Sequence, residues 1–498
     1  MQSGADLPDN QTISMKREAK LIEALIPLII LIGLLTANVF LFDDTLAGSN
    51  QMALLLASTV AGLLALRTGL RWADIERKVV DTIKSAMPSI LILLMIGALA
   101  GAWMISGVVP AMIYYGLDII SPKMFLFTAV AVSAIVSVAT GSSWSTVATI
   151  GVALLGIGTA IGISEAIVAG AIISGAYFGD KMSPLSDTTN LAPAMAGTDI
   201  FTHIRYMVYT TTPSLIITFI IFLVMGFSFD FSDAVIDVQN VKTAIEGTFN
   251  TSPLLFLVPG LLLTIIVLKV PPLPALIAGT LLGVLFALIF QPHIIREVSG
   301  ISDHYLKAGY IASMQAMFGS VSLITSDSSV NELLSTTGMR GMLDTIWLIL
   351  AAMVFGGTME AAGFLRRITQ PIIRVATKPG SLVASTVGTC VFFNATASDQ
   401  YISIVVPGRM YRKAYEEQGL KPEVLSRTLE DAGTMTSVLI PWNTCGATQS
   451  RVLGVATWDY LPYCFFNLIS PLMSIAFAVL NIKIRRLTSK TTKEVPVE

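Results

Sequence analysis

Four clusters of oxygen-bearing residues interrupt long apolar stretches of this sequence. They read "TGSSWST" at 140–146, "GDKMSPLSDTTN" at 179–190, "NATASDQ" at 394–400 and "PWNTCGATQS" at 441–450. Hydroxyl, amide and carboxylate oxygens are the ligands of hard cations, and interrupted helices add free backbone carbonyls to them. The clusters therefore predict sites for a small hard cation such as Na+.

The carboxylates in these clusters are the strongest candidates for function. Asp187 and Asp399 lie at the centres of interrupted segments, where a charge is costly and usually marks an ion path. Asp180 is a third candidate, although the adjacent Lys181 could neutralise it as a structural pair. A carboxylate that binds either H+ or Na+ produces antiport when its access alternates between the two sides. The predicted ion ligands are Asp187, Asp399, Asp180, Ser142, Ser143, Ser145, Ser183, Ser186, Asn190, Asn394, Thr396, Asn443 and Thr444.

The same residues also allow a purely structural interpretation. Small hydroxyl residues are common where transmembrane helices approach closely. Pro184 and Pro441 each remove one helical hydrogen bond, so we expect the helices to unwind there. Glu430 and Asp431, about ten residues before Pro441, are left undecided between the cytoplasmic surface and the membrane interior. Glu360 is the weakest of the carboxylate candidates.

The composition is that of an integral membrane protein. Of the 498 residues, 54% are hydrophobic and only 13% are charged, and the net charge is −2. Soluble domains carry about 25% charged residues. The three cysteines show no metal-ligand spacing and no disulfide framework.

Apolar runs of membrane-spanning length recur along the chain. We expect ten crossings, near 22–41, 52–68, 88–106, 164–198, 206–228, 253–269, 272–290, 343–362, 425–458 and 460–482. Two further stretches, 124–158 and 379–412, are predicted re-entrant hairpins, because non-helical backbone survives at membrane depth only inside protein or beside water. Lys and Arg concentrate in the segments that this count places inside, so both termini are expected in the cytoplasm. The stretch 291–342 is not assigned to a crossing, because its moderately apolar segment could be an additional re-entrant or interfacial piece.

Three pairs of segments repeat in the same order at a separation of about 255 residues. "GAWMISG" at 101 corresponds to "GTMEAAG" at 357, and "TGSSWST" corresponds to "NATASDQ". The segment that begins at Glu165 corresponds to the segment that begins at Glu423. Each half then has five crossings, so the second half must be inverted in the membrane. Inverted repeats with broken helices are typical of secondary transporters.

The predicted fold is an all-α polytopic membrane protein with two inverted-topology repeats. Each repeat has five crossings and a re-entrant hairpin, with broken helices at the midplane. The expected domains are a cytoplasmic segment at 1–20, repeats at 21–230 and 253–485, an external linker at 231–252 and a cytoplasmic tail at 486–498.

The segments "TGSSWSTVATIG" and "SGAYFGDKMSPLSDTTNLAPAMAGTDIFTHIRYM" resemble the NhaC family of Na+/H+ antiporters, in the ion transporter superfamily. That family also includes malate/lactate antiporters. The resemblance covers about residues 20–485 and marks Gly141 to Ser145, Asp180, Ser183, Ser186, Asp187 and Asn190, whereas the second half matches less closely. It implies exchange of cytoplasmic Na+ for external H+ at the bacterial inner membrane.

Other functions remain open at this stage. The main alternative is a Na+/H+-coupled antiporter of organic acids with the same fold, whose substrate carboxylate would bind at helix N-termini. A passive channel fits inverted repeats poorly. An intramembrane protease would not need the many hydroxyl ligands, so we do not expect an enzyme. No cofactor is expected beside the transported Na+ and H+. The expected partners are the lipid bilayer and the substrates, with a homodimer left open and no nucleic acid.

Overall fold

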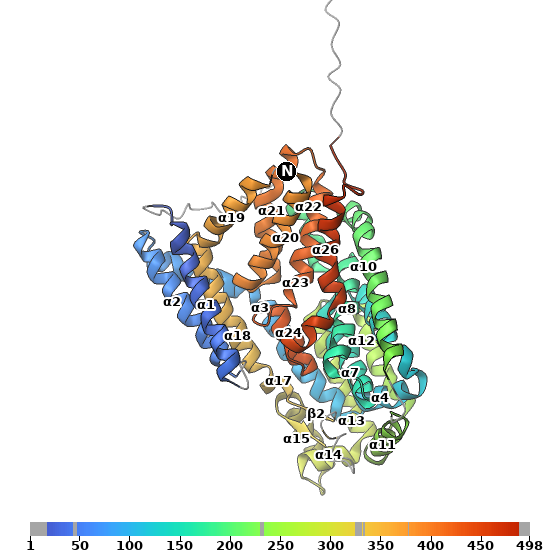
Figure 1. Ribbon diagram of the computed structural model, residues 1–498. Coiled ribbons are helices and arrows are strands. Elements are labelled where there is room, and N and C mark those ends of the chain that lie inside the picture. The colour runs from blue at the N-terminus through green and yellow to red at the C-terminus, as the bar shows by residue number, and fades with distance from the viewer. Residues whose placement is uncertain are drawn as a thin grey trace, which may run out of the picture.

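The computed structural model describes residues 17–42, 47–229, 234–323, 331, 334–376 and 378–487. They form a helical protein whose long helices run between two ends of the molecule (Figure 1). The first half contains α1 (Leu21–Leu41), α2 (Ser49–Arg67), α3 (Trp72–Ile105), α4 (Val108–Ile119), η1 (Pro122–Met124), α5 (Phe125–Thr140), α6 (Ser143–Thr146), η2 (Val147–Gly151), α7 (Val152–Ala160), α8 (Glu165–Met182), α9 (Asp187–Ala196) and α10 (Ile200–Ser228).

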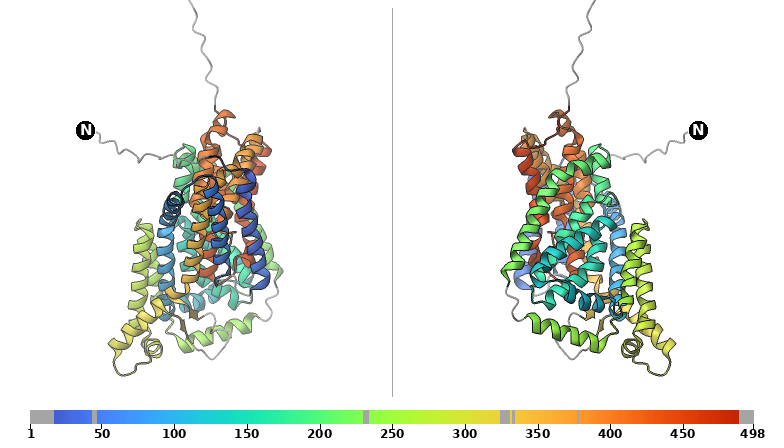
Figure 2. Two further views of the ribbon diagram at one scale, coloured as in Figure 1. Left: turned by 90° about the vertical axis from the view of Figure 1, so that its left-hand side faces the viewer. Right: turned by 90° about the vertical axis from the view of Figure 1, so that its right-hand side faces the viewer.

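A linking helix, α11 (Ala234–Thr248), lies across the lower end of the molecule (Figure 2). It occupies most of the predicted linker 231–252. The second half contains η3 (Pro253–Phe256), α12 (Leu257–Val267), α13 (Pro272–Phe290), α14 (Pro292–Ser299), α15 (Tyr305–Phe318), β1 (Val321–Ser322), β2 (Ser335–Thr336), α17 (Gly338–Gly341), α18 (Leu343–Ala361), α19 (Phe364–Val375), α20 (Pro379–Thr396), α21 (Gln400–Glu417), α22 (Pro422–Leu429), η4 (Glu430–Thr434), α23 (Met435–Ser437), α24 (Thr444–Leu453), α25 (Thr457–Tyr460), η5 (Leu461–Tyr463) and α26 (Phe465–Val479).

The helices confirm a polytopic membrane protein. Among the described residues, eight helices are long and apolar enough to cross a membrane, or up to ten if each of two bent helix pairs counts as one span. The eight include both arms of the stretch predicted as the first hairpin, Pro122–Thr140 and Ser143–Ala160. Each arm is therefore long enough to cross, and the return of this hairpin to its own side stays a prediction.

Helix α3 begins at Trp72, well before the predicted start of the third crossing at 88. Its first turns are amphipathic, because Ile75, Thr82 and Ala86 are buried whereas the charged residues between them are mostly exposed or half-buried. An apolar stripe of this kind holds a charged helix against the protein, which a search for continuous apolar runs does not detect.

The predicted interruptions at the two prolines are confirmed. Helix α8 ends at Met182 and α9 begins at Asp187, with Pro184 between them. Helix α23 ends at Ser437 and α24 begins at Thr444, with Pro441 between them. Both breaks thus place non-helical backbone beside polar side chains.

Two of the three repeated segment pairs share the geometry at their helix ends. Helices α3 and α18 are each followed by a glycine with positive φ, Gly107 at 76° and Gly363 at 67°. Helices α5 and α20 are likewise followed by residues with positive φ, Gly141 at 70° and Ser398 at 58°. Directly after Gly141 and after Ser398, an N-cap residue with extended backbone begins the next helix.

The described residues of the stretch 291–342 lie at the lower end of the molecule in Figure 1. Its longest helix, α15, packs on α3 at Gly101, where a Cβ atom would lie 1.8 Å from the carbonyl oxygen of Ala316. Ala308 and Ala312 are also buried on this helix. The stretch therefore packs on the bundle through a helix of 14 residues.

Candidate functional site

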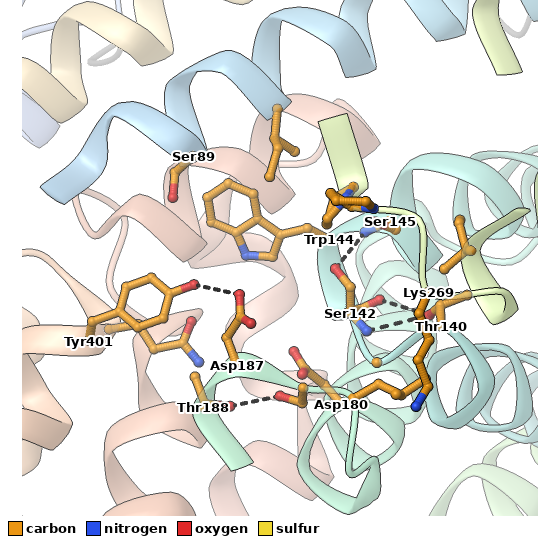
Figure 3. A pocket seen from close by; sticks show the side chains of 18 of the residues that line it. Ser89, Thr140, Ser142, Trp144, Ser145, Asp180, Asp187, Thr188, Lys269 and Tyr401 are labelled. Atoms are coloured by element: carbon orange, nitrogen blue, oxygen red, sulfur yellow. Dashed lines mark hydrogen bonds between the residues drawn. The ribbon is translucent and has the colours of Figure 1, made fainter. Parts of the chain in front are cut away.

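A cavity of about 240 Å³ lies where the interrupted segments of both halves meet (Figure 3). All four predicted polar clusters contribute to its wall, and α3 and the loop between α12 and α13 complete it. The lining residues are Ser89, Ile92, Thr140, Gly141, Ser142, Trp144, Ser145, Asp180, Leu185, Ser186, Asp187, Thr188, Ile266, Lys269, Val270, Pro271, Pro272, Gln400, Tyr401 and Thr444. Residues more than 300 positions apart in the sequence thus share one site.

Four helices begin at or beside this cavity. Their N-cap side chains each accept a hydrogen bond from a backbone N–H of the first turn, as polar N-cap residues do. The pairs are Ser142 with Ser145 in α6, Ser186 with Thr189 in α9, Asp399 with Ile402 in α21, and Asn443 with Cys445 in α24. The positive ends of these helices therefore lie around the cavity and favour negative charge there.

Asp180 is buried at the cavity wall and is held by the first residue of α6. Its Oδ2 accepts hydrogen bonds from the Ser143 backbone N–H at 3.1 Å and from Ser143 Oγ at 2.7 Å. A carboxylate at a helix N-terminus is a favourable arrangement. Asp180 is 8% exposed and lines the cavity together with Ser186, whose side chain interacts with its carboxylate.

Asp187 lies at the first position of α9 and is exposed at the cavity. The Tyr401 hydroxyl, from the start of α21, approaches its Oδ2 to 3.5 Å (Figure 3). The carboxylates of Asp180 and Asp187 therefore share one cavity, one buried and one accessible.

The interpretation of Lys181 as the partner of Asp180 is wrong. Lys181 Nζ forms a fully buried ion pair with Asp431 and donates to Ser470 Oγ at 2.9 Å. Successive side chains on a helix point about 100° apart, so Asp180 faces α6 while Lys181 faces η4 and α26. Glu430 and Asp431 are both fully buried within the protein.

Several predicted ligands lie away from the cavity wall. Ser183 Oγ donates to the Val138 carbonyl, and the Asn190 amide donates to the Ser186 and Pro184 carbonyls. In the second half, Asn394 donates to the Gly433 carbonyl, Thr396 to that of Phe392 and Asn443 to that of Asn394. Asp399 is 2% exposed and caps α21 without lining the cavity. These side chains hold the interrupted segments together.

The cavity offers oxygen atoms from side chains of both halves of the chain. Among the described residues, no group of three His, Cys, Asp or Glu side chains is arranged to hold a metal ion. A cation in the cavity would take its ligands from Asp180 and Asp187 together with the Ser142 and Ser145 hydroxyls and free carbonyls. Glu360 lies elsewhere, paired with Lys78 at 2.7 Å.

The sequence matches a described protein family over most of the second half and part of the first. The model of the family described as "Na+/H+ antiporter family" matches residues 175–482. The chain belongs to the Na+/H+ antiporter family.

The similarity to related antiporters extends over nearly the whole chain. The Na+/H+ antiporter NhaC of Alkalihalophilus pseudofirmus is 37% identical over 93% of this chain and 97% of its own length. The NhaC protein of Bacillus subtilis is 37% identical over 85% and 91%. The malate-2H+/Na+-lactate antiporter of B. subtilis is 34% identical over 90% and 92%. These comparisons confirm the expected family, and they confirm that the relatives are transporters rather than enzymes.

The antiporter's cavity also contains residues that are not among the predicted ion ligands. Trp144 lies within "TGSSWST", and Gln400 and Tyr401 lie at the end of "NATASDQ". Lys269 comes from the loop between α12 and α13 and has a φ of 65°, which is uncommon for a non-glycine residue. A basic loop residue between two apolar runs reads as a cytoplasmic anchor, so nothing local indicated that it reaches the cavity.

Proposed function

We propose that this antiporter exchanges cytoplasmic Na+ for external H+ by alternating access, and that Na+ and H+ compete for Asp180 and Asp187. The observation that carries this proposal is that both carboxylates line one cavity with the Ser142 and Ser145 hydroxyls. A bound Na+ neutralises part of the negative charge of the two carboxylates, and a bound proton does the same. Competition for the same oxygens then couples the two fluxes without a cofactor.

The proposed alternation uses two inverted repeats. The matching helix ends of two segment pairs, and the breaks at Pro184 and Pro441 in the third pair, support the repeat. In Figure 1, α18 leads up from α17 to α19 whereas α3 leads down to α4, which supports opposite orientations. With both termini in the cytoplasm of a bacterial inner membrane, the loop that carries Lys269 is on the cytoplasmic side. The cavity beside that loop is then accessible from the cytoplasm.

Proteoliposomes with an internal pH dye test the proposal. We expect Na+ alone to drive proton movement that saturates with Na+ concentration and needs no organic acid. Proton movement that depends strictly on added malate or lactate would overturn Na+/H+ exchange as the function.

An organic acid antiporter is the second candidate, and one observation favours it. The exposed Lys269 side chain and the helix N-termini surround a cavity with room for several water molecules, at about 30 Å³ each. An ammonium group and free backbone N–H groups together suit a small carboxylate. If this candidate is correct, Lys269→Gln lowers malate- or lactate-dependent exchange, whereas Na+/H+ exchange without organic acid does not need the ammonium group.

A further inference from the structure

A buried carboxylate outside the cavity is connected to it through hydroxyl groups. Glu430 is fully buried in the π-helical turn η4. Its Oε1 accepts a hydrogen bond from Thr188 Oγ1 at 3.0 Å, and Thr188 lines the cavity. Its Oε2 has no hydrogen-bond partner among the described residues. Turns with π-helical geometry are rare and frequently occur at functional sites.

The connection continues from Thr188 to the cavity carboxylate. Thr188 Oγ1 and Ser186 Oγ lie 3.1 Å apart. The Ser186 side chain interacts with the Asp180 carboxylate, and both residues line the cavity. Hydroxyl groups both donate and accept, so this chain can pass a proton in either direction.

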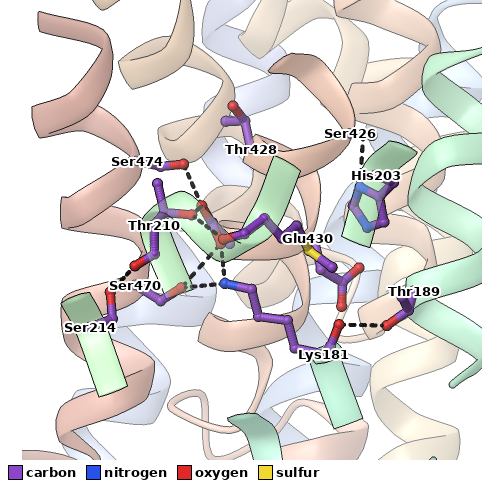
Figure 4. A network of polar contacts seen from close by, with 12 residues as sticks. Lys181, Thr189, His203, Thr210, Ser214, Ser426, Thr428, Glu430, Ser470 and Ser474 are labelled. Carbon is purple, nitrogen blue, oxygen red and sulfur yellow. Dashed lines mark hydrogen bonds and ion pairs between the residues drawn. The ribbon is translucent and has the colours of Figure 1, made fainter. Parts of the chain in front are cut away.

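The neighbouring Asp431 shows by contrast why Glu430 is suited to this task. Asp431 accepts hydrogen bonds from Lys181, Ser470, Ser474 and Thr210, so its charge is compensated and its hydrogen bonds are made. Figure 4 labels these four donors. Glu430 has one hydrogen bond and one open oxygen. A group that gains and loses a proton needs such an open position.

A buried arginine, Arg427, precedes Glu430 in the chain. It lies three residues earlier on the same helical segment, where side chains are neighbours. Its guanidinium is fully buried over the Tyr206 ring at 4.4 Å, and its three nitrogens lack hydrogen-bond partners among the described residues. A buried cation without a partner is costly, and a nearby carboxylate anion offsets that cost. The charges that act on Glu430 are those of Asp180 and Lys181 in α8.

We propose that Glu430 is the proton acceptor of a relay that runs from Asp180 through Ser186 and Thr188. This inference rests on the proposed Na+/H+ exchange. When Na+ displaces the proton of Asp180, its O–H bond breaks and the proton passes to Ser186 Oγ. Ser186 passes its own hydroxyl proton to Thr188, and Thr188 passes its proton to Glu430 Oε1. Protonated Asp180 and ionised Glu430 become ionised Asp180 and protonated Glu430, so charge and atoms balance.

The relay separates proton transfer from Na+ binding, and two exchange reactions measure them separately. Radiolabelled Na+ exchange against unlabelled Na+ moves no net protons, whereas Na+-driven acidification or alkalinisation requires proton transfer. We expect Glu430→Gln to slow Na+-driven proton movement by about 100-fold, the size of a lost acid–base group. Na+/Na+ exchange should be retained. Glu360→Gln is the control, since Glu360 is paired with Lys78 away from the cavity.

Thr188 provides a second test if Glu430→Gln does not fold. Thr188→Val keeps the shape but removes the hydroxyl, and Thr188→Ser keeps the hydroxyl. We expect the valine variant to lose proton movement while retaining Na+/Na+ exchange, and the serine variant to retain both. Wild-type proton movement in Glu430→Gln, or equal activity of the two Thr188 variants, would overturn the relay. A wild-type protein in which Na+ moves no protons would instead overturn the proposed function itself.

Discussion

Ser143 donates two hydrogen bonds to one oxygen of Asp180, one from its backbone N–H and one from its hydroxyl. This contact joins the start of α6 to the last turn of α8 and fixes the buried carboxylate at the cavity. We expect Asp180→Asn to abolish Na+-driven proton movement, because an amide neither carries a negative charge nor exchanges a proton. The loss should be about 100-fold or more, as for a removed acid–base group.

Ser143→Ala is the matched variant for this contact. It removes the hydroxyl donor and leaves the backbone N–H, so we expect exchange to continue at a reduced rate. Both variants are measured with the pH dye in proteoliposomes after equal reconstitution. Full activity of Asp180→Asn would exclude Asp180 from the exchange mechanism.

Asp187 should act mainly on Na+ affinity, because its carboxylate is exposed at the cavity. A unit charge at contact distance contributes about 1 to 4 kcal/mol between the limits of water and a protein surface. We therefore expect Asp187→Asn to raise the half-saturating Na+ concentration by about tenfold, equal to about 1.4 kcal/mol. Initial rates over a Na+ series measure this. An unchanged half-saturation would mean that Asp187 does not contact the ion.

The buried ion pair between Lys181 and Asp431 should support stability rather than exchange. Removing one partner of a buried pair leaves an uncompensated charge and costs about 3–5 kcal/mol. We expect Lys181→Met to lower the thermal unfolding temperature in detergent strongly, and Lys181→Met with Asp431→Asn to recover most of the loss. If the double variant is no more stable than Lys181→Met, the charge of Asp431 is not what destabilises the single variant.

The local chemistry of this chain was predictable from its sequence, and its long-range partners were not. Pro184 and Pro441 identify the helix breaks because a proline acts on its own turn of helix. The polar residues beside them were recognisable, but a ligand and an N-cap use the same residue types. Asp399 therefore looked like an ion carrier, and the structure places it as a cap.

Partner choice depends on which way a side chain points in the folded protein. Asp180 and Lys181 are adjacent, yet their partners are Ser143 and Asp431, 37 and 250 residues away. No periodic pattern in one sequence contains that information. The same holds for Lys269, whose positive φ belongs to the end of α12 and whose place at the cavity depends on how α12 packs.

Gly141 is the position at which the tip of α5 should tolerate no side chain. It has a φ of 70°, and a Cβ atom there would lie 2.6 Å from Leu185 Cβ and 2.8 Å from the Leu185 carbonyl carbon. Leu185 belongs to the break between α8 and α9, so the clash would displace the backbone between Asp180 and Asp187. We expect Gly141→Ala to lower both the thermal unfolding temperature and the initial rate of Na+-driven proton movement.

Gly162→Ala separates this clash from backbone strain. Gly162 has a φ of 82°, and nothing lies within 4 Å of an added Cβ. Both alanine variants bear the cost of a left-handed residue, about 1–2 kcal/mol, but only the Gly141 variant meets Leu185. We expect the Gly162 variant to lose stability while keeping its transport rate. Equal transport by the two variants would show that the contact between Gly141 and Leu185 does not position the carboxylates.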